Sequence, residues 1–264
     1  MTTVAYQGEP GAFSEDAARR LVADAEPRGY TTFDDVIDAV ESGANDLALL
    51  PVENSIYGPI ARAYDLLWEH PALHVVDEIV YHVIQSLIGT IDTTIETIVE
   101  VRSHPVALEQ CRLLFDAHPS WRRAIVDDTA GAVRDVVARG DRTIAAIAHA
   151  SAAARYGARV LREGVQDDPD NATRFFLVSR ERPQTTQGKR ACIIVELHDR
   201  PGSLRDALSA FADRDMNLRS LVARPSHRGA FRYRFTCELE NVANDRLAAA
   251  ITAIGGEARV VGIY

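Results

Sequence analysis

Along the first 180 residues, short apolar strands, polar clusters and amphipathic helices follow one another repeatedly. Residues 47–52 form an apolar run typical of a buried strand, and Glu53, Asn54 and Ser55 follow it directly. Residues 33–42 carry apolar side chains at helical spacing. In open α/β sheets, ligands bind outside the carboxyl ends of strands, where such polar clusters fall. The pattern predicts an α/β fold of two lobes with a cleft between them.

The overall composition limits the partners that we expect. The chain has 264 residues, of which 47% are hydrophobic and 25% charged, as in ordinary globular proteins. Its formal net charge of −9 argues against nucleic acid as a partner, because phosphate binding needs a basic face. An anionic ligand must therefore be held by local arginine side chains and backbone N–H groups, since Lys189 is the only lysine.

Targeting and cofactor signals are not found in the sequence. The N-terminal residues lack a basic region followed by an apolar stretch, and no apolar run is long enough to span a membrane, so we expect neither a signal peptide nor a membrane partner. Cys111, Cys192 and Cys237 are far apart and lack metal-ligand spacing. The glycine-containing loop at residues 7–14 does not have a dinucleotide-binding spacing. We expect a cytoplasmic protein without a metal or cofactor.

The polar cluster at residues 170–174 runs into the apolar strand of residues 175–178. Thr173 offers a hydroxyl that donates and accepts, Arg174 a planar fork suited to a carboxylate, and Asn171 an amide. Together these groups suit a small polyanion. On these residues alone, a turn before a core strand is the simpler interpretation.

Two further clusters precede predicted helices. Ser103 and His104 come before a helix over residues 106–115, and Thr129 comes before a helix over residues 132–138. Side chains at a helix start can contribute to an anion site or can simply cap the helix. His104 titrates near neutrality, so it is either a general acid or an orienting group. Ser14 is the expected N-cap of a helix over residues 15–24.

The pattern changes near residue 180. Residues 180–188 (RERPQTTQG) are polar with proline and glycine, as in a linker. Strands are then predicted at residues 191–197, 218–224, 231–238 and 258–263, with helices at 204–213 and 245–254. This βαββαβ order is the split βαβ arrangement of ferredoxin-like domains.

Four segments in order give a family resemblance: PVENS (residues 51–55), SHP (103–105), DTAGA (128–132) and TRF (173–175). The sequence resembles the prephenate dehydratase family over essentially its whole length. The resemblance implies a catalytic domain at 1–180 that is similar to type II periplasmic binding proteins. Lobe 1 would hold about 1–75 and 161–180, and lobe 2 about 76–160. A linker at 181–190 and a regulatory ACT domain at 191–264 would follow.

The implied reaction converts prephenate into phenylpyruvate, CO₂ and water in phenylalanine biosynthesis, without a cofactor. Thr173 would hydrogen-bond the leaving hydroxyl as the catalytic residue. Arg174 would clamp a carboxylate and Phe175 would pack beside the ring. The remaining substrate contacts would come from Asn54, Ser55, Ser103, His104, Thr129 and Asn171. Two alternatives stay open: an arogenate dehydratase, and a ligand-binding regulatory protein without catalysis.

The resemblance also implies feedback regulation by L-phenylalanine at the ACT domain. The implied effector contacts are Gly202, Ser203, Leu204, Asn217, Leu218, Arg224 and Pro225. The family's ESRP segment is VARP here, at residues 222–225, so the details of effector binding differ. An ACT domain that only dimerises is the alternative. We expect a monofunctional enzyme that is a homodimer or homotetramer through its ACT domains.

Overall fold

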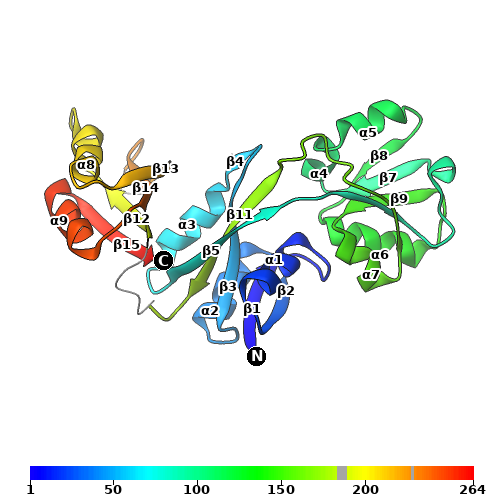
Figure 1. Ribbon diagram of the computed structural model, residues 1–264, viewed down its shortest axis with the longest axis horizontal. Coiled ribbons are helices and arrows are strands. Elements are labelled where there is room, and N and C mark those ends of the chain that lie inside the picture. Colours follow the sequence, from blue (N-terminus) through cyan, green and yellow to red (C-terminus); the bar gives the residue numbers. More distant parts are fainter. Residues whose placement is uncertain (183–188, 227–228) are drawn as a thin grey trace.

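The computed structural model describes residues 1–182, 189–226 and 229–264. The chain folds into three units, each built on its own sheet, and lobe 1 lies between the C-terminal unit and lobe 2 (Figure 1). The expected fold class is confirmed, because two α/β lobes are followed by a four-stranded βαββαβ unit. Most of the expected linker, at residues 183–188, falls outside the described residues.

Lobe 1 contains a six-stranded sheet in the order β2-β1-β3-β11-β5, with β4 beside β3. Its strands are β1 (Thr2–Gln7), β2 (Ala25–Tyr30), β3 (Leu47–Asn54), β4 (Gly58–Pro59), β5 (His74–His82) and β11 (Ala172–Ser179). Its helices are α1 (Phe13–Leu21), α2 (Phe33–Glu41) and α3 (Ala61–Glu69). A capping box between Thr32 and Asp35 fixes the start of α2.

Lobe 2 contains a five-stranded sheet in the order β10-β6-β9-β7-β8. Its strands are β6 (Ser86–Gly89), β7 (Glu100–Ser103), β8 (Arg122–Ile125), β9 (Ile144–Ala148) and β10 (Arg159–Glu163). Its helices are α4 (Pro105–Glu109), α5 (Arg112–Ala117), α6 (Thr129–Arg139) and α7 (Ala150–Tyr156), with the 3₁₀ turn η1 (Ile95–Thr97). The chain thus crosses between the lobes at residues 83–85 and 164–171.

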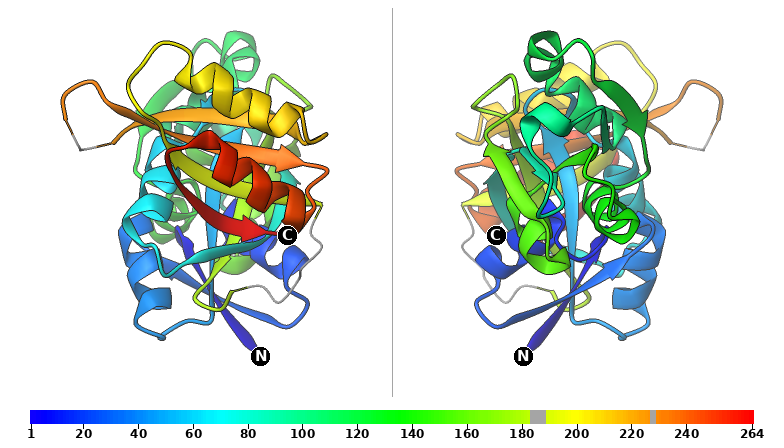
Figure 2. Two further views of the ribbon diagram at one scale, coloured as in Figure 1. Left: turned by 90° about the vertical axis from the view of Figure 1, so that its left-hand side faces the viewer. Right: turned by 90° about the vertical axis from the view of Figure 1, so that its right-hand side faces the viewer.

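The C-terminal unit has four antiparallel strands in the order β13-β14-β12-β15. They are β12 (Arg190–Glu196), β13 (Asn217–Pro225), β14 (Tyr233–Glu240) and β15 (Glu257–Ile263). Helices α8 (Ser203–Ala212) and α9 (Asn244–Ile254) cover its outer face, and the other face is turned toward lobe 1 (Figure 2).

The sheet of lobe 1 is shared by two hydrophobic cores, one on each face. Phe176 on β11 belongs to a core that continues into the C-terminal unit through Cys192 and Ile194. Phe175, the preceding residue, belongs to a core that continues into lobe 2 through Val133 and other side chains. Because successive side chains of a strand point to opposite faces, β11 contacts both neighbouring units.

Three local expectations need correction. Helix α1 begins at Phe13 with Ala12 as N-cap, not at Ser14, because Glu15 turns back and accepts from Gly11 N at 2.7 Å. The helix expected over residues 106–115 is two helices, because the Asp167 carboxylate caps the start of α5. The crossing into lobe 2 lies after β5, and residues 159–163 pair with β6 in lobe 2, so both crossings come later in the chain than expected.

Candidate active site

Three side chains on neighbouring strands of lobe 1 form a row on one face of its sheet. Thr173 on β11 lies opposite Asn54 on β3 and opposite Tyr81 on β5. Directly opposed residues in antiparallel strands point to the same face of the sheet. Asn54, Thr173 and Tyr81 therefore share the face that is turned toward α1 and lobe 2.

Asn54 links two of the sequence clusters. Its Nδ2 donates to Thr173 Oγ1 at 3.1 Å and to Asn171 Oδ1 at 3.0 Å, and its Oδ1 accepts from the backbone N–H groups that follow at residues 56 and 57. Ser55 Oγ accepts from Ala172 N at 3.0 Å. The structure therefore brings Asn54, Ser55, Asn171 and Thr173 together.

The Thr173 hydroxyl is oriented by Asn54 to act as a donor. Its Oγ1 accepts from Asn54 Nδ2, and this is its one hydrogen bond to the residues that the structure describes. Its own proton is therefore available to a ligand. Beside it, the amide Nδ2 of Asn171 is buried and lacks a partner in the described part of the chain. An unpaired buried donor costs about 1–3 kcal/mol, so such a group commonly marks a functional site.

Arg174 lies on the opposite face of β11 from Thr173. Its guanidinium is 2.8 Å from Glu53, 2.6 Å from Glu238 of the C-terminal unit and 3.3 Å from Glu78. It is 5% exposed; burial alone would lower its pKa, but Glu238 and Glu53 outweigh that effect and raise it. The structure thus does not bring Arg174 to the other expected substrate residues. Phe175 is 2% exposed and packs in the core that the two lobes share.

The expected residues of lobe 2 lie at strand ends and helix starts. Ser103 is buried and donates to Ile147 O at 2.6 Å. His104 is the N-cap of α4 and accepts from Val106 N at 3.3 Å. Thr129 is the first residue of α6, whose N-cap is Asp128. His104 therefore caps its helix, as one of its two interpretations predicted. The residue that caps α6 is Asp128 and not Thr129.

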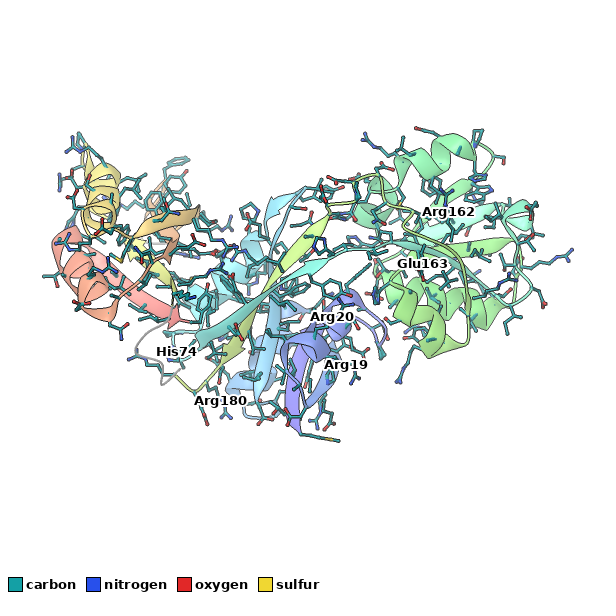
Figure 3. The ribbon with its side chains drawn as sticks, viewed as in Figure 1. Arg19, Arg20, His74, Arg162, Glu163 and Arg180 are labelled. Carbon is teal, nitrogen blue, oxygen red and sulfur yellow. The ribbon has the colours of Figure 1, made fainter. Side chains whose placement is uncertain are left out.

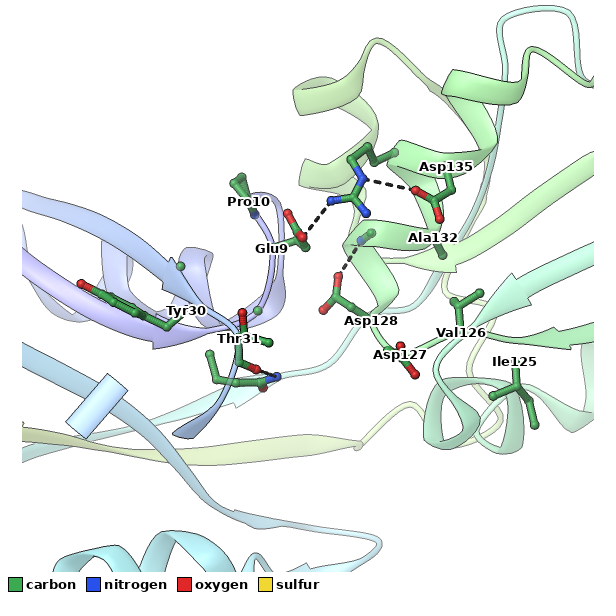
Figure 4. A pocket seen from close by; sticks show the side chains of 15 residues that line it. Glu9, Pro10, Tyr30, Thr31, Ile125, Val126, Asp127, Asp128, Ala132 and Asp135 are labelled. Carbon is green, nitrogen blue, oxygen red and sulfur yellow. Dashed lines mark hydrogen bonds and ion pairs between the residues drawn. The ribbon is translucent and has the colours of Figure 1, made fainter. Parts of the chain in front are cut away.

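A cleft of about 610 Å³ lies between the lobes. Its lobe 1 side is formed by the loop at residues 7–10 and the end of β2, and its lobe 2 side by residues 125–128 and α6 (Figure 4). Arg134 bridges it, 2.8 Å from Glu9 and 3.2 Å from Asp135. Burial raises the pKa of Asp128, whose carboxylate caps α6. The loop at residues 7–14 is thus a cleft wall.

A second group of polar residues between the lobes was missed by sequence reasoning. Tyr81 Oη lies 2.6 Å from Asp16 Oδ2 and 3.1 Å from His149 Nε2. Tyr81 falls in a stretch that reads only as extended chain. His149 follows a strand and precedes a helix, as His104 does, and this repeated pattern is the signal that could have identified it.

Only some of the expected effector residues of the C-terminal unit line a common cavity. Ser203 and Leu204 line a cavity of about 190 Å³ together with residues 196–200 and 231–233. Gly202 is the N-cap of α8 at φ +87°. Asn217 and Leu218 begin β13 and do not line this cavity. Arg224 pairs with Asp65 of lobe 1 at 2.5 Å, and the carbonyl of Pro225 accepts from Arg234.

The family model of prephenate dehydratase matches residues 4–183, and the ACT domain model matches residues 193–252. The chain belongs to the prephenate dehydratase family. It is 40% identical over 224 residues to arogenate dehydratase/prephenate dehydratase 2, chloroplastic, of Arabidopsis thaliana, covering 84% of this chain and 58% of that protein. The chain thus spans a little over half the length of this relative.

Two solved structures resemble this family member over nearly its whole length. One is prephenate dehydratase from Arthrobacter aurescens in complex with L-Phe, with a TM-score of 0.89, 29% identity, and 99% and 89% coverage of the two chains. The other is described as GqqA, a novel type of quorum-quenching acylase, with a TM-score of 0.90, 29% identity, and 99% and 97% coverage. In the described part of this dehydratase-family chain, no helix is long and apolar enough to cross a membrane.

Proposed function

We propose that the protein is a carbon–oxygen lyase that converts prephenate into phenylpyruvate, CO₂ and water. The observation that carries this proposal is the Asn54–Thr173 hydrogen bond, which leaves the Thr173 proton free on the face of the lobe 1 sheet that is turned toward lobe 2, in a prephenate dehydratase family fold. A leaving hydroxyl needs such a donor, because hydroxide departs poorly without a proton.

In the proposed reaction, the bond between the ring and its carboxylate breaks and CO₂ leaves. The electron pair of that bond moves into the ring, which becomes aromatic as the C–OH bond breaks. The departing oxygen takes a proton and leaves as water. Thr173 donates the hydrogen bond to this oxygen as negative charge develops on it. A threonine hydroxyl is too weak an acid to act alone, so it relays a proton that water replaces.

Asn54 is proposed to hold Thr173 in this role. The amide donates to Oγ1, and hydrogen bonds in such a chain polarise one another, so the Thr173 O–H becomes a better donor. Ser55, Asn171 and Ser103 remain proposed substrate contacts. Arg174 already pairs with three carboxylates, so we propose that substrate carboxylates are held by neutral donors, among them the hydroxyl of Thr129 at the start of α6.

The choice of substrate is the part of the proposal that needs measurement. The plant relative carries both the arogenate and the prephenate dehydratase names, and the Arthrobacter protein carries the prephenate name. Purified protein should be assayed with each substrate, following phenylpyruvate by its alkaline absorbance and phenylalanine by chromatography. Phenylpyruvate formation at the higher kcat/KM supports the proposal. Faster conversion of arogenate would make the protein an arogenate dehydratase, and no turnover of either would favour a binding protein.

Regulation by L-phenylalanine through the ACT domain is a further part of the proposal. The cavity beside Ser203 and Leu204 is about 190 Å³, smaller than the roughly 300 Å³ at which ligand pockets usually begin. A second ACT domain that contributes Asn217 and Leu218 would enlarge it. We therefore propose a homo-oligomer in which phenylalanine binds between paired ACT domains. We also propose that the protein is cytoplasmic and that a linker at residues 181–190 joins its two domains.

Equilibrium dialysis with labelled phenylalanine tests the regulatory proposal directly. Loss of phenylalanine binding in Ser203→Trp, together with a smaller sedimentation coefficient of this variant that shows separation of the paired ACT domains, would support the shared site. No binding at millimolar concentration would remove the regulatory role and leave the catalytic proposal in place.

A further inference from the structure

A chain of hydrogen bonds joins the two lobes through Tyr81, the residue opposite Thr173 on the neighbouring strand. It begins at Asp16, whose Oδ2 lies 2.6 Å from Tyr81 Oη, and continues from Tyr81 to His149 Nε2 at 3.1 Å. His149 Nδ1 lies 2.6 Å from Ser151 Oγ, which lies 2.9 Å from the carbonyl oxygen of Gly11. The chain therefore leaves lobe 1 at Tyr81 and returns to it at Gly11.

The participating side chains come from four elements. Asp16 belongs to α1 and Tyr81 to β5 in lobe 1, whereas His149 and Ser151 stand at the start of α7 in lobe 2. The Phe13 ring packs 4.9 Å from the His149 ring. These side chains lie where the two lobes meet. In Figure 3, the labels Arg19 and Arg20 on α1 show the lobe 1 side of this boundary, and the labels Arg162 and Glu163 on β10 show the lobe 2 side.

The number of protons available decides how this chain can be bonded. Asp16 pairs with Arg20 at 2.8 Å and is a carboxylate, so the Tyr81 hydroxyl donates its one proton to Asp16. A carbonyl only accepts, so a bond between Ser151 and Gly11 takes the one proton of Ser151. Both hydroxyl oxygens then face His149 as acceptors, and both ring nitrogens must donate. All of these bonds exist together only when His149 is an imidazolium.

A neutral His149 gives a different arrangement. With its one proton on Nδ1, it keeps the bond to Ser151, and Ser151 keeps the bond to Gly11, but the bond to Tyr81 is lost. With its proton on Nε2, it keeps the bond to Tyr81 and Nδ1 becomes an acceptor. Nδ1 lies only 2.6 Å from Ser151 Oγ, where two facing lone pairs would repel, so it accepts from the Ser151 hydroxyl in place of Ser151 N at 3.3 Å. When the hydroxyl proton turns to Nδ1, the bond to Gly11 O is lost. One of the two hydrogen bonds by which this chain joins the lobes therefore depends on the protonation of His149.

We propose that His149 is a positioning residue whose neutral form carries its proton on Nε2, so that its protonation, through Ser151, attaches the loop at residues 7–14 to lobe 2. This inference rests on the proposed function only for its effect on substrate. Gly11 is close to α7 in this arrangement, since an added Cβ would lie 2.8 Å from Ala152 Cα, and its φ of +93° also requires glycine. Gly8, Glu9 and Pro10 of the same loop line the cleft.

The surroundings of His149 set the pH range of this change. Burial is the largest effect and lowers its pKa, the charges of Asp16 and Glu163 raise it, and that of Arg20 lowers it. The net direction is downward, so the imidazolium forms only below the ordinary value of about 6.5. The Ser151–Gly11 bond then forms at acidic pH and is lost as the pH rises through the pKa of His149, while the Glu9–Arg134 pair at the other end of the loop remains.

The first test measures the loop without substrate. Amide hydrogen exchange of residues 9, 11 and 12 should be followed at about pH 4.5 and at about pH 7.5 and corrected for intrinsic rates. One hydrogen bond corresponds to about a two- to tenfold change in protection. We expect this loss of protection at the higher pH in the native protein, and low, pH-independent protection in Ser151→Ala. Equal protection in both proteins at both pH values would overturn the proposal.

The second test uses turnover. KM should rise about two- to tenfold with pH in the native enzyme and should be pH-independent in His149→Gln and Ser151→Ala, whereas kcat should change less. His118→Gln is the control, since His118 stacks on Trp121 within lobe 2 at 4.0 Å. A pH-dependent KM that survives in Ser151→Ala would contradict the proposal. If the loop protection depends on pH but the protein turns over neither prephenate nor arogenate, only the proposed function is refuted.

Discussion

Arg174 on β11 and Glu238 on β14 form a two-pronged ion pair between lobe 1 and the ACT domain. Nη1 lies 2.6 Å from Oε2 and Nη2 lies 2.9 Å from Oε1, and both side chains are almost fully buried. Arg174 also holds Glu53, the residue before Asn54. The ACT sheet is therefore bonded to the strand that carries Thr173 and, through one guanidinium, to the strand that carries Asn54.

Removing Arg174 should cost more stability than removing Glu238. Arg174→Ala leaves the buried Glu238 with the Tyr64 hydroxyl as a partner but with no cation, and breaking a buried pair in this way costs about 3–5 kcal/mol. Glu238→Ala leaves Arg174 paired with Glu53 and Glu78 and should cost about 1–3 kcal/mol. Urea unfolding measures both, with the exposed Arg205→Ala as a control. A larger loss for Glu238→Ala would contradict this account.

Replacing Thr173 should reduce turnover without affecting the fold. Thr173→Val keeps the shape but removes the proton donor, so kcat should fall about 10- to 1000-fold, the range for loss of one transition-state donor. Thr173→Ser retains the hydroxyl and should stay within about tenfold of the native enzyme. Steady-state kinetics and thermal melting of both variants provide the measurement. Native kcat in a folded Thr173→Val would end the catalytic role of this residue.

Local chemistry predicted most elements and the cluster around Thr173. The alternation of polar groups and apolar strands located β3 and β11, and Asn54, Ser55, Asn171 and Thr173 do meet. These residues sit where strands end, and strand ends can be read from a short window of sequence. The same reasoning placed Ser103 and His104 at the start of α4.

The role of Arg174 could not be read in the same way. Residues 175–178 are apolar throughout because both faces of β11 are buried, so the pattern does not reveal which face is turned to the cleft. Its partner Glu238 lies 64 residues away in a separate domain, and no local signal encodes how that domain docks. Arg224 shows the same limit, because its partner Asp65 lies in α3.

The contact between α3 and the ACT domain should weaken in acid. Burial alone would raise the pKa of Asp65, but Arg224 and Arg234 outweigh it and hold the pKa below its ordinary value. A carboxyl with a lowered folded pKa stabilises the fold above its unfolded pKa of about 3.9, and this contribution is lost as the pH falls through the folded value.

Asp65→Asn is the matched test of this acid sensitivity. The variant should lose about 1–3 kcal/mol at neutral pH, because its three charged hydrogen bonds to Arg224 and Arg234 are weakened, and its loss should shrink toward zero at the lowest pH. Denaturant unfolding between about pH 3 and about pH 7 gives both curves. Parallel curves for the native protein and the variant would contradict the linkage.

Gly262 on β15 fixes how closely the ACT domain can approach lobe 1. A Cβ there would overlap the carbonyl oxygen of Val75 on β5, so Gly262→Ala should cost about 1–3 kcal/mol and loosen the docking of the domain. Cys192 lies in the core between the two units and is fully buried, and burial raises its pKa, so its thiol should be inert in the native protein. Gly262→Ala should expose Cys192 to a thiol reagent, while Cys111, buried within lobe 2, serves as the internal control. Labelling of Cys111 and Cys192 at equal rates would indicate global unfolding and contradict selective undocking.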